Sequence, residues 1–123
     1  MEKGEGYRKL QIYERSYKAA RAIYEMSKTF PQEEMYAITS QIRRASLSIP
    51  LNIAEGYVKR ESQQEFKRYL MMAIGSSNEV SVLLDFVKDL GYIQQEQYEK
   101  ARREYEELSK MLNSFIQTTK SNI

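Results

Sequence analysis

The side chains able to do chemistry in this sequence are carboxylates, amides, hydroxyls and basic groups, because histidine and cysteine are both absent. Without histidine the chain lacks the usual proton-transfer group near neutral pH and the commonest metal ligand. Glu55 and Glu79 are the carboxylates that an acid–base pair would use, but no nucleotide-binding loop or metal-ligand spacing accompanies them. We therefore expect no enzymatic activity, no metal and no cofactor. Glu79 is predicted instead to accept a hydrogen bond from Gln41 or an arginine and to set the register of two helices.

Two adjacent arginines, Arg43 and Arg44, are the first candidates for binding a partner. Neighbouring residues of a helix point about 100° apart, so the two side chains cannot face one partner equally. A planar guanidinium binds either carboxylate or phosphate through two hydrogen bonds. Both a structural or interface role and a nucleic-acid role therefore fit this pair.

A second basic group surrounds a polar stretch of the chain and consists of Lys59, Arg60, Lys67 and Arg68. It is either ordinary solvated surface or a phosphate-binding edge, which an oligomer would repeat on every subunit. The net charge of +2 is not that of a strongly basic nucleic-acid binder, although residues 1–60 carry 11 Lys and Arg against 7 Asp and Glu. The ten tyrosines could stack on bases, but their helical spacing also suits the edges of a core.

Four long helices are predicted to position these side chains, over about residues 7–28, 31–57, 62–90 and 95–118. Apolar residues recur there at steps of three and four, and the chain has only five Gly and two Pro. The residues that carry the period are Leu10, Tyr13, Tyr17, Ala20 and Tyr24, then Met35, Ile38, Ile42, Ala45, Ile49 and Ile53, then Phe66, Leu70, Ala73, Ile74, Val80, Leu84 and Val87, and finally Tyr98, Ala101, Tyr105, Leu108, Leu112 and Phe115. Short links between long helices favour antiparallel neighbours. The sequence thus predicts one all-α domain, an up-down-up-down four-helix bundle over residues 1–123.

Five positions are predicted to shape these helices. Pro31 suits the first turn of the second helix, and Pro50 inside that helix is expected to kink it. Ser62 with Glu65 fits a capping box at the start of the third helix, and Gly91 fits its end. Gly75, in the middle of the third helix, is expected to permit close approach of a neighbouring helix.

The first helix carries a second apolar stripe beside the first, made of Ile12, Ala19, Ile23 and Met26. The two stripes together cover about half of the helix circumference. This wide arc is either a core with tyrosines at its edges or a core plus a second surface buried between subunits. No apolar run approaches the roughly 18–20 residues that a bilayer requires, so we expect a cytoplasmic protein with no membrane partner.

Residues 39–56, TSQIRRASLSIPLNIAEG, closely resemble the signature of a bacterial family of four-helix bundles called 23S rRNA intervening-sequence proteins. Further matches are Glu65-Phe66 with Tyr69-Leu70, then Ala73, Gly75-Ser76 and Glu79, and finally Leu90-Gly91-Tyr92 and Phe30-Pro31. The resemblance covers about Leu10 to Thr118. The sequence departs from the family pattern at Leu51, where a small polar residue is usual, and over residues 77–82, which lack the usual leucines.

The resemblance implies an antiparallel four-helix bundle that assembles as a homopentamer with a central pore and has no enzyme activity. Members are encoded within intervening sequences of bacterial large-subunit rRNA genes. A related accessory protein of diversity-generating retroelements binds a reverse transcriptase and nucleic acid through a basic surface. A reverse transcriptase is therefore one protein partner that the resemblance suggests.

The predicted function is that of a homo-oligomeric, non-enzymatic bundle, with a pentamer favoured, that binds RNA or DNA. The predicted contact residues are Arg43, Arg44, Lys59, Arg60, Lys67 and Arg68, and the predicted structural or interface residues are Gln41, Pro50, Asn52, Glu55, Gly75 and Glu79. The main alternative is a protein-interaction adaptor or scaffold without nucleic-acid binding. A third possibility is a bundle that holds a small ligand.

Overall fold

The computed structural model describes residues 6–121, which form four long α-helices and two short 3₁₀ segments without strands. The helices are α1 (Gln11–Ser27), α2 (Ile38–Val58), α3 (Gln63–Asp89) and α4 (Gln95–Ser121). The 3₁₀ segments are η1 (Gly6–Lys9), which precedes α1, and η2 (Gln32–Glu34), which lies between α1 and α2. The prediction of an all-α chain with four long helices is confirmed.

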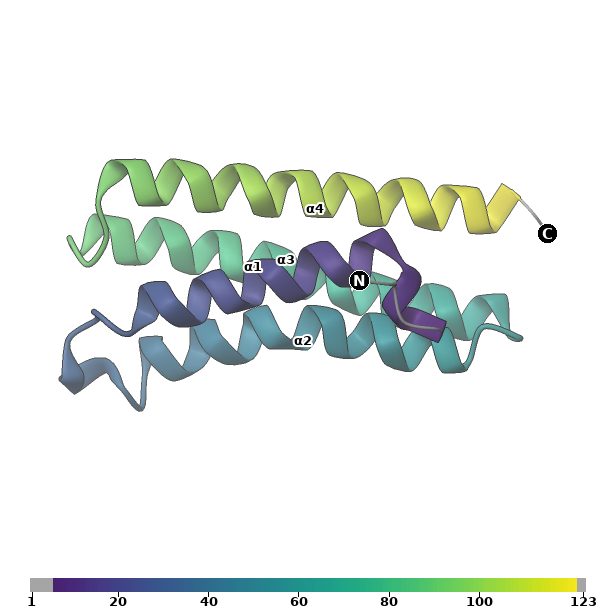
Figure 1. Ribbon diagram of the computed structural model, residues 1–123, viewed down its shortest axis with the longest axis horizontal. Helices are drawn as coiled ribbons and strands as arrows, with labels where there is room; N and C mark the ends of the chain where they lie inside the picture. The colour runs from purple at the N-terminus through teal and green to yellow at the C-terminus, as the bar shows by residue number, and fades with distance from the viewer. Residues whose placement is uncertain (1–5, 122–123) are drawn as a thin grey trace.

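The four helices lie side by side along the long axis of the molecule, and the colour of the chain runs in opposite senses along successive helices (Figure 1). Each helix packs on the next one in the chain, and α4 closes the ring against α1. The α1–α4 contact is the least extensive of the four. The bundle therefore has four seams, and the α1–α4 seam lies opposite the α2–α3 seam.

One continuous core fills the space between the helices. Its largest fully buried side chains are Tyr105, Ile23, Ile42, Ile49, Ile53, Leu70, Leu84, Leu108, Leu112, Val80 and Val87. Full burial of one such aliphatic side chain contributes about 1.5–3 kcal/mol, so the core dominates the stability of the fold. From α1 the core takes Ile12, Ala19 and Ile23, whereas Tyr17 and Tyr24 remain half exposed at its edge.

The second helix begins at Ile38 and not at Pro31, so its predicted start is wrong. Pro31 instead precedes η2, and the chain then crosses through a turn before α2. Two tertiary contacts hold this crossing: Phe30 is buried with its ring 5.8 Å from that of Tyr92, and the Tyr92 hydroxyl donates a 2.6 Å hydrogen bond to Glu34. The first helix is likewise shorter than predicted, since residues 6–9 are 3₁₀ and α1 begins at Gln11.

The predictions at Pro50, Ser62 and Gly91 agree with the structure in most respects. Helix α2 continues through the buried Pro50, as expected for one helix rather than two. The Ser62 hydroxyl accepts a 3.2 Å hydrogen bond from the Glu65 amide, which is half of the predicted capping box. Among the described residues the other half is absent, because the Ser62 amide donates a 3.0 Å hydrogen bond to the Lys59 carbonyl and the Glu65 carboxylate pairs with Arg68. Gly91 has a φ of 78°, a left-handed conformation that glycine adopts without strain.

The close-packed glycine is Gly56, and the prediction that Gly75 permits close helix approach is wrong. A Cβ atom added at Gly75 would have nothing within 4 Å, because this residue faces outward from α3. A Cβ atom added at Gly56 would lie 2.8 Å from the Cβ of Tyr69 and 3.1 Å from Phe66. Gly56 therefore allows the C-terminal end of α2 to approach α3 closely.

Helix α3 is, among the described residues, the one helix long and apolar enough to cross a membrane by length and composition. The sequence analysis expected no such segment. The bundle core explains much of this composition, because eight residues of α3 are buried among the other helices. A core helix of a helical bundle passes the same test.

Candidate nucleic-acid interface

The six basic residues predicted to bind nucleic acid form two groups, one within α2 and one at the link from α2 into α3, where Lys67 and Arg68 lie near the start of α3. Arg43 and Arg44 lie in the first half of α2, whereas Lys59 and Arg60 follow its C-terminal end. Lys59 follows Arg43 by 16 positions, which correspond to about 24 Å at the 1.5 Å rise of an α-helix. The two groups are therefore separate places on the bundle and not one patch.

The first group opens into a hollow of about 280 Å³ on the seam between α1 and α2, which we call the arginine–tyrosine hollow. Its lining residues are Tyr17, Ala20, Arg21, Tyr24, Arg43, Arg44, Ser46 and Leu47. Three of these eight side chains are arginines, two are tyrosines and none is acidic. The lining thus combines the groups that bind phosphate with the groups that stack on bases.

Arg43 is held in place at one side of the arginine–tyrosine hollow. Its Nε donates a 2.7 Å hydrogen bond to the hydroxyl of Ser27, and its guanidinium carbon lies 4.1 Å from the centre of the Tyr24 ring. Ser27 is itself buried and donates a 2.8 Å hydrogen bond to the Tyr24 carbonyl. Because a carboxylate takes no part, the positive charge of Arg43 is oriented but not neutralised.

Arg21 and Arg44 are the other two cations of the arginine–tyrosine hollow, and both are exposed. Within residues 6–121 neither of them forms an ion pair, so both charges are available to an anion. Tyr17 and Tyr24 are 46% and 51% exposed. Sequence reasoning missed Arg21, although its spacing from Tyr17 and Tyr24 by four and three residues places all three on one helical face.

The second group lies at the link between α2 and α3, and we call it the basic link (Lys59, Arg60, Lys67 and Arg68). The Arg60 guanidinium lies 4.0 Å from the centre of the Tyr57 ring and donates a 2.9 Å hydrogen bond to the Tyr57 carbonyl. Lys59 and Lys67 are exposed. In the part of the chain that the structure describes, none of these three cations forms an ion pair with a carboxylate, although the charge of Lys59 acts on Glu65 from a distance.

Arg68 differs from the rest of the basic link because it is paired. Its guanidinium donates hydrogen bonds of 3.0 and 3.2 Å to the two oxygens of Glu65. These bonds lower the pKa of Glu65 below its ordinary value. Arg68 therefore adds less free positive charge to the basic link than the sequence suggested.

Comparison with known proteins shows that both basic groups lie in a region shared with one family. The family model for the 23S rRNA-intervening sequence protein matches residues 8–114. The chain belongs to this family. A solved structure from Bacteroides thetaiotaomicron, described as a protein with unknown function from the S23 ribosomal protein family, is 28% identical with a TM-score of 0.78. The similarity covers 85% of this chain and 97% of that one. No curated protein sequence matches the chain.

In this member of the 23S rRNA-intervening sequence protein family, the matched residues include both the arginine–tyrosine hollow and the basic link. They also include a hollow of about 600 Å³ on the α2–α3 seam, where Gln41, Arg44 and Glu79 lie together. Within the described residues, however, Glu79 accepts no hydrogen bond from Gln41 or from an arginine. The predicted hydrogen bond of Glu79 is therefore not made in this structure, and Glu79 lies exposed beside Gln41 and Arg44 in the hollow.

Smaller side chains connect α2 to α3 instead. The hydroxyls of Ser48 and Ser76 form a hydrogen bond across the seam, and Gly56 packs against Tyr69. Within residues 6–121, Asn52 makes only a local hydrogen bond, 2.8 Å from its Nδ2 to the Ser48 carbonyl, and Glu55 is exposed. Asn52 was predicted to be structural on this seam, but its hydrogen bond stays within α2.

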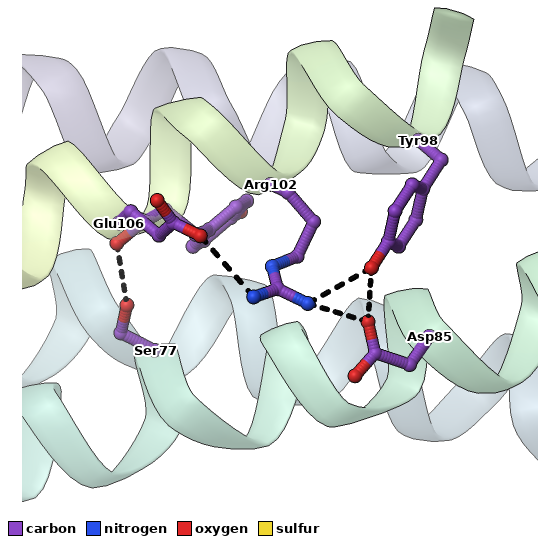
Figure 2. A network of polar contacts seen from close by, with 6 residues as sticks. Ser77, Asp85, Tyr98, Arg102 and Glu106 are labelled. Carbon is purple, nitrogen blue, oxygen red and sulfur yellow. Dashed lines mark hydrogen bonds and ion pairs between the residues drawn. The ribbon is translucent and has the colours of Figure 1, made fainter. Parts of the chain in front are cut away.

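A polar network that sequence reasoning missed joins α3 to α4 (Figure 2). Asp85 accepts hydrogen bonds from the Tyr98 hydroxyl at 2.6 Å and from Arg102 at 2.5 Å, and Arg102 also pairs with Glu106 at 3.1 Å. The bond from Tyr98, together with Arg102, lowers the pKa of Asp85. The signal in the sequence was the spacing of Tyr98, Arg102 and Glu106 by four residues. Since Arg102 is paired twice, this network serves helix packing rather than anion binding.

Proposed function

We propose that this chain is a non-enzymatic, homo-oligomeric bundle that binds single-stranded RNA or DNA through the arginine–tyrosine hollow. The observation that carries this proposal is the composition of the hollow, with three arginines, two tyrosines and no acidic residue. The binding unit is one antiparallel up-down-up-down bundle. Its second helix bends at Pro50, where the Ser46 carbonyl lacks its usual amide donor.

The chemistry of the arginine–tyrosine hollow fits a single strand better than a duplex. Guanidinium groups bind phosphate oxygens through paired, charge-assisted hydrogen bonds. Half-exposed tyrosine rings offer their faces to bases, and only unpaired bases present faces for stacking. Arg43 is already oriented by Ser27, so binding does not have to order that side chain.

Self-association is proposed for a second surface, the α2–α3 face. Seven apolar side chains on the outer sides of these helices are each 45–72% exposed, namely Leu51, Val58, Met71, Met72, Val82, Phe86 and Leu90. Monomeric proteins rarely expose so many apolar side chains on two adjacent helices. Together with the family resemblance, this supports a homo-oligomer, with a pentamer favoured. An oligomer would repeat the arginine–tyrosine hollow on every subunit and strengthen weak binding through multivalency.

The test is fluorescence anisotropy with labelled single-stranded RNA, single-stranded DNA and duplex DNA at several salt concentrations. Arg21→Glu with Arg44→Glu changes the hollow, and Arg60→Glu with Lys67→Glu changes the basic link. Arg103→Glu with Lys110→Glu is the control, because these exposed residues of α4 give the same change in net charge elsewhere. Affinity for single strands should fall about tenfold or more in the hollow variant. For the native protein, the logarithm of the association constant should fall linearly with the logarithm of the salt concentration, with a slope of about −0.7 per phosphate contacted.

Three results would overturn nucleic-acid binding at this site: no binding by the native protein, equal binding by the hollow variant, or an equal loss in the α4 control. An equal or larger loss in the basic-link variant would move the contact to the α2–α3 link. The α2–α3 face favours a second candidate function, that of a protein-interaction adaptor such as a reverse-transcriptase partner. This function would be supported if the native protein bound no nucleic acid and remained a monomer.

A further inference from the structure

The seam between α1 and α4 holds a hollow of about 650 Å³, which we call the α1–α4 hollow. Its apolar lining consists of Ala19, Ala22, Ile23, Met26, Ala101 and Tyr105. Small-molecule sites in proteins are mostly apolar and measure about 300–1,000 Å³. The α1–α4 seam lies opposite the α2–α3 face, so self-association through that face leaves the hollow open.

Small side chains keep the α1–α4 hollow open. Ala19 and Ala22 from α1 and Ala101 from α4 stand where larger side chains would close the seam, and these two helices contact each other least of the neighbouring pairs. The ion pair between Arg15 and Glu104, 3.0 Å long, joins the helices beside the hollow. The helices are therefore tied together without being packed tightly along the whole seam.

The floor of the α1–α4 hollow includes a buried polar group without a partner. Tyr105 is 1% exposed, and its hydroxyl makes no hydrogen bond to the described part of the chain. Buried hydroxyls are nearly always hydrogen-bonded, because an unpaired one costs folding free energy. The hydroxyl has almost no accessible surface, so a ligand would reach it by widening the loosely packed α1–α4 seam, and a ligand oxygen or nitrogen would then supply the partner that Tyr105 lacks.

The rim of the α1–α4 hollow carries one cation that nothing neutralises. Lys18 pairs with Glu14 and Glu25 pairs with Lys28, and Glu104 pairs with Arg15 as described above. Lys100 lies on the same rim and makes no ion pair within residues 6–121. The charges of the rim therefore favour a ligand that carries one negative group.

We propose that the α1–α4 hollow binds a small amphipathic anion, an aromatic or aliphatic body with a single carboxylate or sulfonate group. The apolar body lies against Ala22, Met26 and Ala101, and the anionic group faces Lys100. A hydrogen-bonding atom of the ligand meets the hydroxyl of Tyr105. The site shares no residue with the arginine–tyrosine hollow, so it does not depend on nucleic-acid binding.

The experiment uses 8-anilinonaphthalene-1-sulfonate, a fluorescent aromatic sulfonate, with dodecanoate as competitor. Ala22→Phe places a large ring in the hollow, and Ala101→Leu fills it from the opposite wall if the first variant is unstable. Lys100→Gln removes the charge of the rim, with Lys110→Gln as the charge-matched control on the same helix. Val82→Ser controls for adsorption of the dye to the α2–α3 face. Circular dichroism checks that each variant is folded.

The dye should bind the native protein saturably, and dodecanoate should displace it. We expect Ala22→Phe or Ala101→Leu to weaken dye binding at least tenfold. Lys100→Gln should weaken it about two- to fivefold, which corresponds to one exposed ion pair. Lys110→Gln and Val82→Ser should leave it unchanged. The site is refuted if binding is not saturable, if folded filling variants bind the dye as the native protein does, or if Val82→Ser removes the binding. Nucleic-acid affinity of the Ala22→Phe variant should be native, which separates the two sites.

Discussion

The guanidinium of Arg43 is fixed to the end of α1 by Ser27, whose hydroxyl accepts its 2.7 Å hydrogen bond. Ser27 is 2% exposed and sits in the last turn of α1, whereas Arg43 lies in the second turn of α2. The bond therefore connects two helices across the turn and crossing that separate them. It also presents Arg43 beside Tyr24 in a single orientation at the arginine–tyrosine hollow.

Ser27→Ala should release Arg43. The unfolding free energy should fall by about 1 kcal/mol, since one buried hydrogen-bonded hydroxyl is removed. Affinity for single-stranded nucleic acid should fall about threefold, because Arg43 must then be ordered on binding. Urea unfolding and anisotropy measure the two effects. Thr29→Ala is the control, because the exposed Thr29 hydroxyl makes a similar local bond to the Met26 carbonyl without contacting an arginine. Equal effects of the two variants would show that Ser27 does not orient Arg43 for binding.

The two helical glycines, Gly56 and Gly75, should respond to alanine in opposite directions. Gly56→Ala should destabilise the bundle by about 1–3 kcal/mol, because its new Cβ would meet Tyr69 and Phe66. Gly75→Ala should stabilise it by about 0.4–1 kcal/mol, because the site is open and alanine favours the helix. Thermal or urea unfolding of both variants decides the matter. A neutral Gly56→Ala would mean that α2 and α3 separate at little cost.

Asp85 should make the stability of the bundle depend on pH in the acidic range. Its pKa is lowered from 3.8 by the Tyr98 hydroxyl first, and also by Arg102 and Lys88, so the folded state favours the ionised carboxylate. This stabilisation is complete well above pH 3.8 and is lost as the pH falls through the lower pKa of the folded state. Asp85→Asn should therefore be less stable than the native protein at pH 6, and the difference should shrink toward pH 2.5.

Urea unfolding at several pH values measures the contribution of Asp85. The matched control is Glu79→Gln, which neutralises an exposed carboxylate of the same helix that accepts no hydrogen bond within the described residues. The difference in unfolding free energy between Glu79→Gln and the native protein should change less with pH than that of Asp85→Asn. A constant difference between Asp85→Asn and the native protein across this range would show that the network does not favour the charged form.

The α2–α3 face should hold the subunits together. Native mass spectrometry at micromolar concentration should show an oligomer, with five subunits of 14.5 kDa favoured. Val82→Ser with Phe86→Ser should release monomers, because it removes two exposed apolar side chains one turn apart. Met35→Ser, an exposed apolar residue outside the α2–α3 face, is the control and should leave the oligomer intact. A native monomer would refute self-association, and an intact Val82→Ser, Phe86→Ser oligomer would place the interface elsewhere.

The helices were predictable because their apolar periods are long, and a stripe such as Ile42, Ala45, Ile49 and Ile53 predicts its own burial. Local signals also identified the stop at Gly91 and the cap at Ser62. The start of α2 was not predictable from Pro31. A proline suits a 3₁₀ turn as well as an α-helix, and contacts of Phe30 and Glu34 with Tyr92 select the crossing seen here.

The binding surfaces were predictable only in part. Arg43, Arg44, Lys59 and Arg60 were identified by residue type, but their separation into two groups follows from the geometry of α2. Arg21 joins the first group because α1 lies beside α2. Arg68 loses free charge to Glu65, a pairing that competes with the capping role the sequence suggested for that glutamate.

The sequence by itself determined the all-α class, the four helices, the composition of their buried stripes and the family. These properties depend on local propensity and on a period that each helix carries within itself. Only the tertiary structure decided that Gly56 rather than Gly75 is packed closely, that Arg21 meets Arg43 and Arg44, and that Tyr105 lies unpaired beneath an open seam. The physical reason is that such properties depend on which helices are neighbours and at what register. Side chains distant in the chain set that register together, and no single segment encodes it.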